Sequence, residues 1–252
     1  MKIRFLGSGD GKPCQIKRRL TKDFRRPDCI LIDDKVLINP GDEALSFADE
    51  FGFSSLFSEI TDIIFTKNTP EGLSDRTIEK LSAGKNISIY AQKSFLQSIS
   101  LPENLSAVPI RPFVGFRAGH IDLTPLYANC EGGLALALAL FSDRAVFYQP
   151  SGGGIIAESH ALIKDIRFDA AIIDCAMADF PLSAGHFSHN GLDSAAMLKA
   201  ILTKDGLLGE RSRFILTSLP TDKKRADMHA ELASLAAEAG MTAAYDGYFI
   251  TL

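Results

Sequence analysis

The order in which strand and helix patterns follow one another is the feature that most limits the fold of this chain. Short β patterns dominate up to residue 148, and after them strands alternate with helical patterns. This order favours two central sheets that are covered by helices on their outer faces. No linker, low-complexity tract or fixed-period repeat interrupts the 252 residues, so we predict a single domain spanning 1–252.

Individual elements follow from hydrophobic periodicity and from turn residues. Strands are predicted at 1–6, 29–32, 36–39, 60–66, 87–91, 107–109, 113–116, 120–126, 134–141, 145–148, 168–174 and 213–217. Helices are predicted at 42–51, 73–81, 155–163, 192–202 and 222–239. The turn residues at 33–35, 142–143 and 246–247 predict three hairpins, the last between 243–245 and 248–252.

Composition and charge narrow the classes of partner. The formal net charge of −4 makes a nucleic-acid-coating protein an unfavoured interpretation. The start MKIRFLG has no small-residue cleavage site, and no apolar run reaches ~20 residues, so we expect neither a signal peptide nor a membrane span. Four scattered cysteines without a CxxC pair then favour reduced thiols in the cytoplasm. A second copy of the chain, in a homo-oligomer, is one partner that we consider.

Several segments in a fixed order resemble one enzyme family. They are KIRFLGSGDGKP at 2–13, RPDCILID at 26–33, VLINPG at 36–41, IIFT at 63–66, LTPL at 123–126 and AYDG at 244–247. Together they resemble the metallo-β-lactamase-fold hydrolases, in particular the branch of RNase Z and the cyclic phosphodiesterase of the carbon–phosphorus lyase pathway. The resemblance covers essentially the whole chain. It implies a four-layer αββα sandwich of the α/β (α+β) class and chemistry on phosphodiester or ester-like bonds.

The chain departs from this family at the metal-binding motif. The family places HxHxDH directly after the 63–66 strand, where imidazoles and a carboxylate hold two metal ions that activate a bridging water. In this sequence Lys67, Thr69 and Gly72 stand at the three histidine positions, and Glu71 stands at the aspartate position. The Lys67 ammonium would repel a divalent cation at short range.

The other ligand positions of the family are also changed. Cys130 stands where a histidine is expected, Ser218 replaces the last histidine, and no carboxylate occurs at 148–152. Glu71 and Cys130 are therefore the only fallback metal ligands from the expected set. We predict no metal in the usual dinuclear site and no cofactor.

Four residues are candidate catalytic groups: Lys67, Asp174, His186 and His189. By the resemblance, the segment 189–193 aligns with a loop that carries a non-metal histidine, and Asp174 at a strand end can orient a histidine. Lys67 can act as an acid or base if burial lowers its pKa. The competing interpretation is structural, with these side chains bonded to the backbone. A buried, inert thiol is favoured over a nucleophile for Cys175.

Two segments are candidate anion sites. The basic loop 12–26 includes Arg18, Arg19, Arg25 and Arg26, and guanidinium groups match phosphate oxygens. Ser151 and Gly152 precede a helix whose free N–H groups can bind an anion. The alternatives are a solvated surface loop and an ordinary helix start.

These observations give three hypotheses in order of preference. The first is a non-catalytic homologue that binds an anionic small molecule or a partner. The second is a hydrolase with a rearranged or single zinc or manganese site, built from Asp75, Asp174, the two histidines and the fallback ligands. The third is a metal-free acid–base enzyme.

Overall fold

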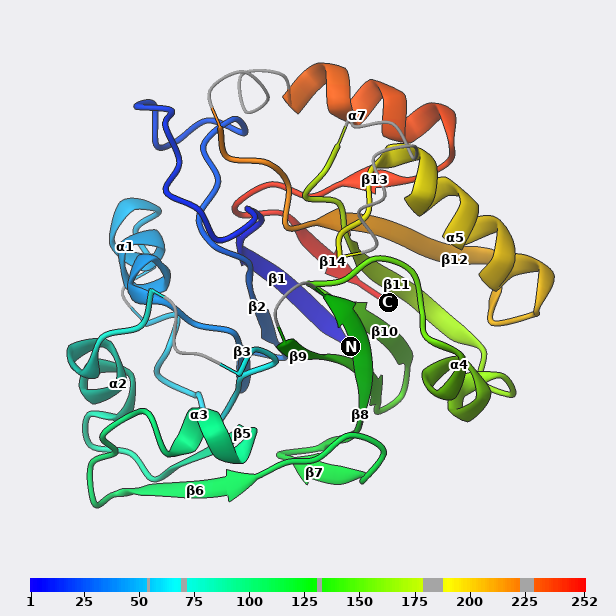
Figure 1. The fold of residues 1–252 in the computed structure, drawn as a ribbon. Helices are drawn as coiled ribbons and strands as arrows, with labels where there is room; N and C mark the ends of the chain where they lie inside the picture. The colour runs from blue at the N-terminus through cyan, green and yellow to red at the C-terminus, as the bar shows by residue number, and fades with distance from the viewer. Residues whose placement is uncertain (54, 69–71, 131–132, 179–187, 223–228) are drawn as a thin grey trace.

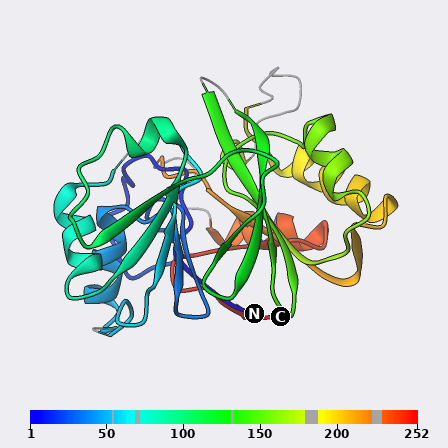
Figure 2. The same cartoon turned by 90° about the horizontal axis from the view of Figure 1, so that it is seen from below.

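The computed structural model describes residues 1–53, 55–68, 72–130, 133–178, 188–222 and 229–252. It has four layers, with two seven-stranded sheets packed face to face and helices on both outer sides (Figures 1 and 2). The αββα sandwich predicted from the resemblance is therefore confirmed. No helix of the described residues is long and apolar enough to cross a membrane.

The first sheet combines antiparallel and parallel strands. Its order is β14 (Phe249–Thr251), β1 (Lys2–Gly7), β2 (Cys29–Ile32), β3 (Val36–Ile38), β4 (Asp62–Ile64), β5 (Ile87–Ala91) and β6 (Leu105–Pro109). Pairing is antiparallel from β14 to β3 and parallel from β3 to β6. Its outer face is covered by α1 (Asp42–Glu50), α2 (Asp75–Ser82) and α3 (Lys93–Leu96).

The second sheet repeats this pairing pattern. Its order is β7 (Phe116–Ala118), β8 (Ile121–Cys130), β9 (Gly133–Phe141), β10 (Ala145–Gln149), β11 (Phe168–Asp174), β12 (Leu208–Thr217) and β13 (Thr242–Ala243). Pairing is antiparallel from β7 to β10 and parallel from β10 to β13. Its outer face is covered by α4 (Ala157–Ile163), α5 (Leu192–Lys204) and α7 (His229–Glu238).

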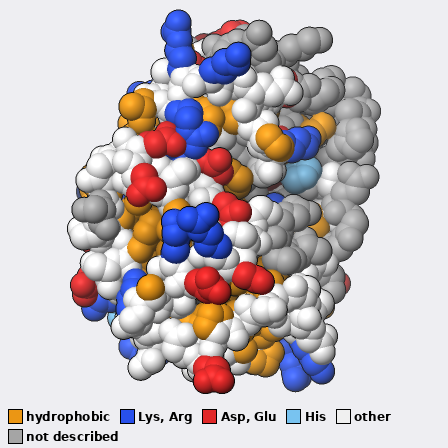
Figure 3. All heavy atoms as spheres, turned by 90° about the vertical axis from the view of Figure 1, so that its left-hand side faces the viewer, with side chains coloured by type: hydrophobic (Ala, Val, Ile, Leu, Met, Phe, Trp, Pro, Cys, Tyr) orange, Lys and Arg blue, Asp and Glu red, His pale blue; other side chains and the backbone are white. Residues whose placement is uncertain are grey.

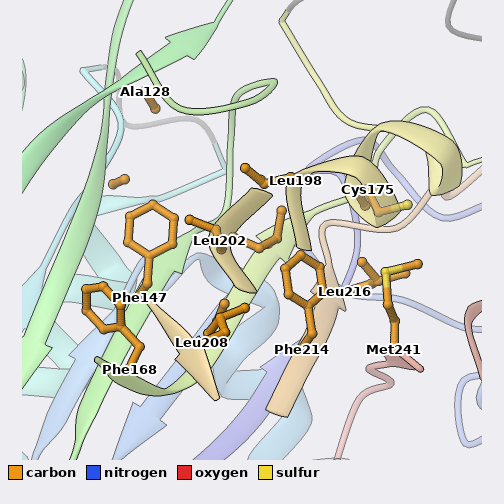
Figure 4. Close-up of a cluster of buried hydrophobic side chains, with 14 of the residues drawn as sticks. Ala128, Phe147, Phe168, Cys175, Leu198, Leu202, Leu208, Phe214, Leu216 and Met241 are labelled. Carbon is orange, nitrogen blue, oxygen red and sulfur yellow. The ribbon is translucent and has the colours of Figure 1, made fainter. Parts of the chain in front are cut away.

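Strand alternation distributes the core between the layers. Successive side chains of a strand point to opposite faces, so Val146 and Tyr148 of β10 pack between the sheets, whereas Phe147 packs under the helices. Figure 4 shows Phe147 and Phe168 close to Leu202 and Leu208 in this helix-side cluster. Burial of each such side chain contributes about 1.5–3 kcal/mol, which fixes the sheet against its helices.

The glycine-rich loop after β1 is held by close backbone contacts. A Cβ atom on Gly7 would lie 1.9 Å from the carbonyl oxygen of Pro27, and one on Gly9 would lie 3.0 Å from that of Arg26. The Gly9 N–H donates to the same Arg26 oxygen at 2.7 Å. Glycine is therefore required here by close approach of two chain segments.

Two local predictions are wrong. The segments around Asp246-Gly247 form no hairpin, because β13 pairs with β12 in one sheet and β14 pairs with β1 in the other. The strand predicted at 113–116 begins only at Phe116, since Phe113 has a φ of +64°. The hairpins at 33–35 and 142–143 are confirmed as antiparallel pairs. Of the helix predicted at 222–239, residues 223–228 lie outside the described part.

Candidate functional site

A cavity lies where the carboxyl ends of parallel strands from both sheets meet. β3 and β4 lead into it from the first sheet, and β10, β11 and β12 lead into it from the second. In sheets with parallel strands, ligands bind outside these carboxyl ends. The cavity has a volume of about 50 Å³, and its polar lining includes Asp10, Asp28, Asn39, Lys67, Ser151, Asp174, His189 and Ser218.

Asp28 connects the two sheets at the floor of this cavity. Its carboxylate accepts hydrogen bonds from the hydroxyl groups of Tyr148 and, at 2.5 Å, Thr217. Burial raises the pKa of Asp28 to about 6, although the two hydroxyl groups and the Lys67 ammonium act against that rise. The same burial and the Asp28 charge raise the pKa of Tyr148, which keeps the phenol protonated as a donor.

Lys67 brings the positive charge of the site. It lines the cavity directly after β4, and a Cβ atom on Gly11 would lie 3.2 Å from its Nζ atom. Its ammonium is close enough to Asp28 to favour the ionised carboxylate. The cationic side chain therefore stands opposite a carboxylate at the junction of the two sheets.

Asp174 and His189 form a hydrogen-bonded pair at the same mouth. Asp174 is fully buried at the end of β11, and His189 Nδ1 lies 3.1 Å from its Oδ2 atom. Asn190 N–H donates to the same oxygen at 2.9 Å. Burial raises the pKa of Asp174 to about 6, and the hydrogen bond to Asp174 raises the pKa of His189. His189 Nδ1 is therefore occupied by the Asp174 carboxylate, and the catalytic roles predicted for Asp174 and His189 stay predictions.

The residues described at the family's ligand positions do not fit a dinuclear centre. In the described part of the chain, no three His, Cys, Asp or Glu side chains gather closely enough to hold a metal ion. Lys67 carries a positive charge, and Ser218 donates its hydroxyl to the Pro150 carbonyl at 2.5 Å. Cys130 is absent from the cavity lining, and its Sγ accepts the Ala135 N–H at 3.4 Å. Glu71 lies outside the described residues.

The remaining candidate site residues differ in whether they line the cavity. His186 lies outside the described residues, so its predicted role stays a prediction. Asp75 lies exposed in the first turn of α2 and does not line the cavity. Ser151 does line it, whereas the Gly152 carbonyl accepts hydrogen bonds from the Gln149 and Asn190 amides. Cys175 is fully buried, and burial raises the pKa of its thiol, as an inert thiol requires.

Three of the four predicted anion-binding arginines contact other parts of the chain. Arg19 bonds to Glu43 and Glu50 at 2.6 Å each. Arg26 is 1% exposed and bonds to Glu50 and Asp246. Arg25 is fully buried and donates to the Pro220 carbonyl at 2.6 Å, whereas Arg18 is exposed. None of the four lines the cavity. On the face that includes α1, basic and acidic side chains are interspersed (Figure 3).

Sequence reasoning missed Asp28, Tyr148 and Thr217 as parts of one site. These residues come from β-strand regions that are far apart in the chain, and no spacing rule connects them. One signal was present, because Asp28 directly precedes the apolar β2 strand and is a carboxylate at a strand boundary. The partner hydroxyl groups become visible only once the two sheets are packed together.

Comparison with known proteins agrees with the architecture. No family model and no curated protein sequence matches the chain. Among solved structures, it is similar to the metallo-β-lactamase fold protein YhfI from Bacillus subtilis, at 15% identity, with 99% of each chain covered and a TM-score of 0.73. It is similar to Zn²⁺-bound PqqB from Methylobacterium extorquens, at 14% identity, with both chains fully covered and a TM-score of 0.75.

The branch that the sequence resembles also occurs among these structures. A diphosphatase of the PhnP family is 15% identical, with 99% of this chain and 96% of that chain covered and a TM-score of 0.72. Human tRNase Z, short form, is 12% identical, with 100% and 99% covered and a TM-score of 0.67. At these identities the likeness shows the fold alone. The chain has the metallo-β-lactamase fold, with neighbours that are hydrolase-like proteins.

Proposed function

We propose that this chain has lost the dinuclear metal site and uses the cavity as a metal-independent site for a small anionic group. The observation that carries the proposal is the pair of donors at the cavity, the Lys67 ammonium and the His189 imidazole, the first of which occupies a family metal-ligand position. Positive charge that metal ions supply elsewhere would here come from the side chains themselves.

The carboxylates of the cavity have partners within the chain. Asp10 accepts hydrogen bonds from the Thr221 hydroxyl and the Lys12 N–H. Asp28 and Asp174 both have pKa values raised to about 6, so each takes up a proton more readily than an ordinary carboxyl when an anion approaches. These features reduce the repulsion that an incoming anion would meet.

The imidazole of His189 can donate a hydrogen bond to an anion in a fixed direction. Asp174 holds Nδ1 and raises the pKa of the ring, which favours the protonated form with an N–H on Nε2. Within the described residues, Nε2 makes no hydrogen bond. A volume of about 50 Å³ admits a compact group such as a phosphate or carboxylate, with any larger part of the ligand outside the mouth.

Calorimetric titration of the full chain with inorganic phosphate, without added metal, tests the proposal. Lys67→Met and His189→Gln should each weaken binding about tenfold or more, the loss expected for one charge-assisted hydrogen bond. Lys12→Met is the matched control, because its side chain is 80% exposed near the same mouth, and it should leave binding nearly unchanged. Absence of saturable binding, or binding that requires zinc or manganese, would contradict the proposal.

A second candidate function is metal-free acid–base catalysis, favoured by the Asp174–His189 pair. A carboxylate that orients a histidine is the arrangement that prepares an imidazole for proton transfer, and such transfer contributes about 10²–10⁴-fold to a rate. Hydrolysis of bis(p-nitrophenyl) phosphate in the presence of a chelator is the assay. Chelator-resistant turnover that His189→Gln lowers at least about a hundredfold would support catalysis. Turnover unaffected by that substitution would rule this candidate out.

A further inference from the structure

A second, larger cleft lies at the other end of the second sheet. Its volume is about 390 Å³, and its lining includes Arg144, Arg167, Asp169, Arg211, Arg213 and Leu252. These residues precede or begin β10 and β11, or belong to β12 and the chain end marked C in Figure 2. The seven residues of β11 separate this end from the cavity at Asp174 by about 20 Å, so the two sites are distinct.

The charge of this cleft is unbalanced. Its lining includes four arginines and two carboxylates, which are Asp169, paired with Arg144 at 3.2 Å, and the α-carboxylate of Leu252. Arg167, Arg211 and Arg213 are exposed and have no carboxylate partner within the described residues. Arg211 and Arg213 of β12 both line the cleft, in the stretch where the register of β11 and β12 shifts.

The position of Arg167 depends on a glycine. A Cβ atom on Gly209 would lie 2.0 Å from Nη2 and 2.7 Å from Cζ of Arg167. The guanidinium therefore lies directly against the Gly209 backbone at the start of β12. A side chain at position 209 would displace the guanidinium from this place in the cleft.

We propose that this cleft binds a ligand with a diphosphate group. Guanidinium groups bind phosphate oxygens in a bidentate manner, and several of them around one cleft match an anion with several charges better than a single phosphate. The volume lies within the range of small-molecule sites, about 300–1,000 Å³, so there is room for an organic part beside the diphosphate. Free diphosphate and a nucleoside diphosphate share this chemistry.

Calorimetry on the full chain at fixed ionic strength tests this site with three probes: inorganic phosphate, inorganic diphosphate and ADP. The expected result is saturable binding of both diphosphate compounds that is tighter than binding of phosphate. Tighter binding of ADP than of diphosphate would identify a nucleoside diphosphate as the source, and equal binding would identify the diphosphate group alone.

Variants locate the binding. Arg211→Gln and Arg213→Gln should each weaken diphosphate binding about tenfold. Gly209→Ala should weaken it severalfold without removing any charge, because it displaces only the end of the flexible Arg167 side chain, and the unfolding temperature should change little. Arg76→Gln, at an exposed position of α2, is the matched control for loss of one positive charge.

The pattern across the variants decides the outcome. Lys67→Met should leave the cleft's diphosphate binding intact, so failure of this site and failure of the cavity proposal can be told apart. Equal weakening by Arg76→Gln and Arg213→Gln would show non-specific charge attraction and overturn the proposal. Absence of saturable diphosphate binding, or binding only of long polyanions, would overturn it as well.

Discussion

Replacement of Asp174 by asparagine should stabilise the protein at neutral pH. The carboxylate is fully buried, and burial raises its pKa from 3.8 to about 6. At 1.36 kcal/mol per pKa unit, holding the ionised form at pH 7 costs the folded state about 3 kcal/mol relative to an ordinary carboxyl. Asparagine keeps the shape and an oxygen for the Asn190 N–H, without the charge.

Urea unfolding of the wild type and Asp174→Asn at pH 4 and pH 7 measures this effect. Because the folded pKa is raised, Asp174 contributes stability that is present below pH 3.8 and is lost as the pH rises to about 6. We expect Asp174→Asn to be about 1–3 kcal/mol more stable at pH 7 and to lack this part of the pH dependence. The control Asp122→Asn, at a site that is 66% exposed, should change stability by less than about 0.5 kcal/mol.

The result that would refute this reasoning is a destabilisation at pH 7. A loss of more than about 2 kcal/mol would mean that the ionised carboxylate stabilises the fold through its hydrogen bonds by more than its burial costs. A gain in the free energy of unfolding on replacing Asp174 would also point to function, because residues that lower stability in a cavity are typical of functional sites. His189 loses the partner that raises its pKa, so its pKa should fall in Asp174→Asn when followed by NMR.

Three further predictions concern the scaffold. Phe147→Ala removes a ring that is only 1% exposed and should lower the free energy of unfolding, measured by chemical denaturation, by about 3–5 kcal/mol. Gly7→Ala places a Cβ atom 1.9 Å from the Pro27 carbonyl oxygen and should lower stability by about 1–3 kcal/mol, whereas Gly84→Ala, with no atom within 4 Å but a φ of +69°, isolates the backbone strain alone. Burial lowers the pKa of His229 to about 4, so the unfolded chain takes up its proton first on acidification. Between pH 7 and pH 5 this group should lower the free energy of unfolding of the wild type by about 2 kcal/mol. His229→Gln should lack this loss in chemical denaturation.

Local sequence patterns predicted much of the architecture. The predicted hairpins at 33–35 and 142–143 exist because their turn residues act within a few positions, and Asp33 and Asp34 both adopt positive φ values. Asp246-Gly247 has an equally good turn sequence, but hydrogen bonds to residues that are distant in the sequence determine its conformation. The Asp246 carboxylate accepts from Arg26 and from Ser8, so the segment crosses from one sheet to the other.

The site was predictable only in part for the same physical reason. Asp174 and His189 are only 15 residues apart in the sequence, so their pairing could be anticipated. The bond from Thr217 to Asp28 spans 189 residues and depends on how the two sheets face each other. In the basic loop, the charge of Arg26 suggested a ligand, whereas one of its carboxylate partners, Asp246, lies 220 residues away in the sequence.

The central claim is that the side chains at the family's metal positions no longer hold metal ions. Elemental analysis of the full chain, purified without chelator and without an affinity tag, tests it most directly. We predict zinc, manganese and iron well below one ion per chain, with the unfolding temperature unchanged by a chelator. Stoichiometric metal, together with a fall in the unfolding temperature when a chelator removes it, would contradict the account.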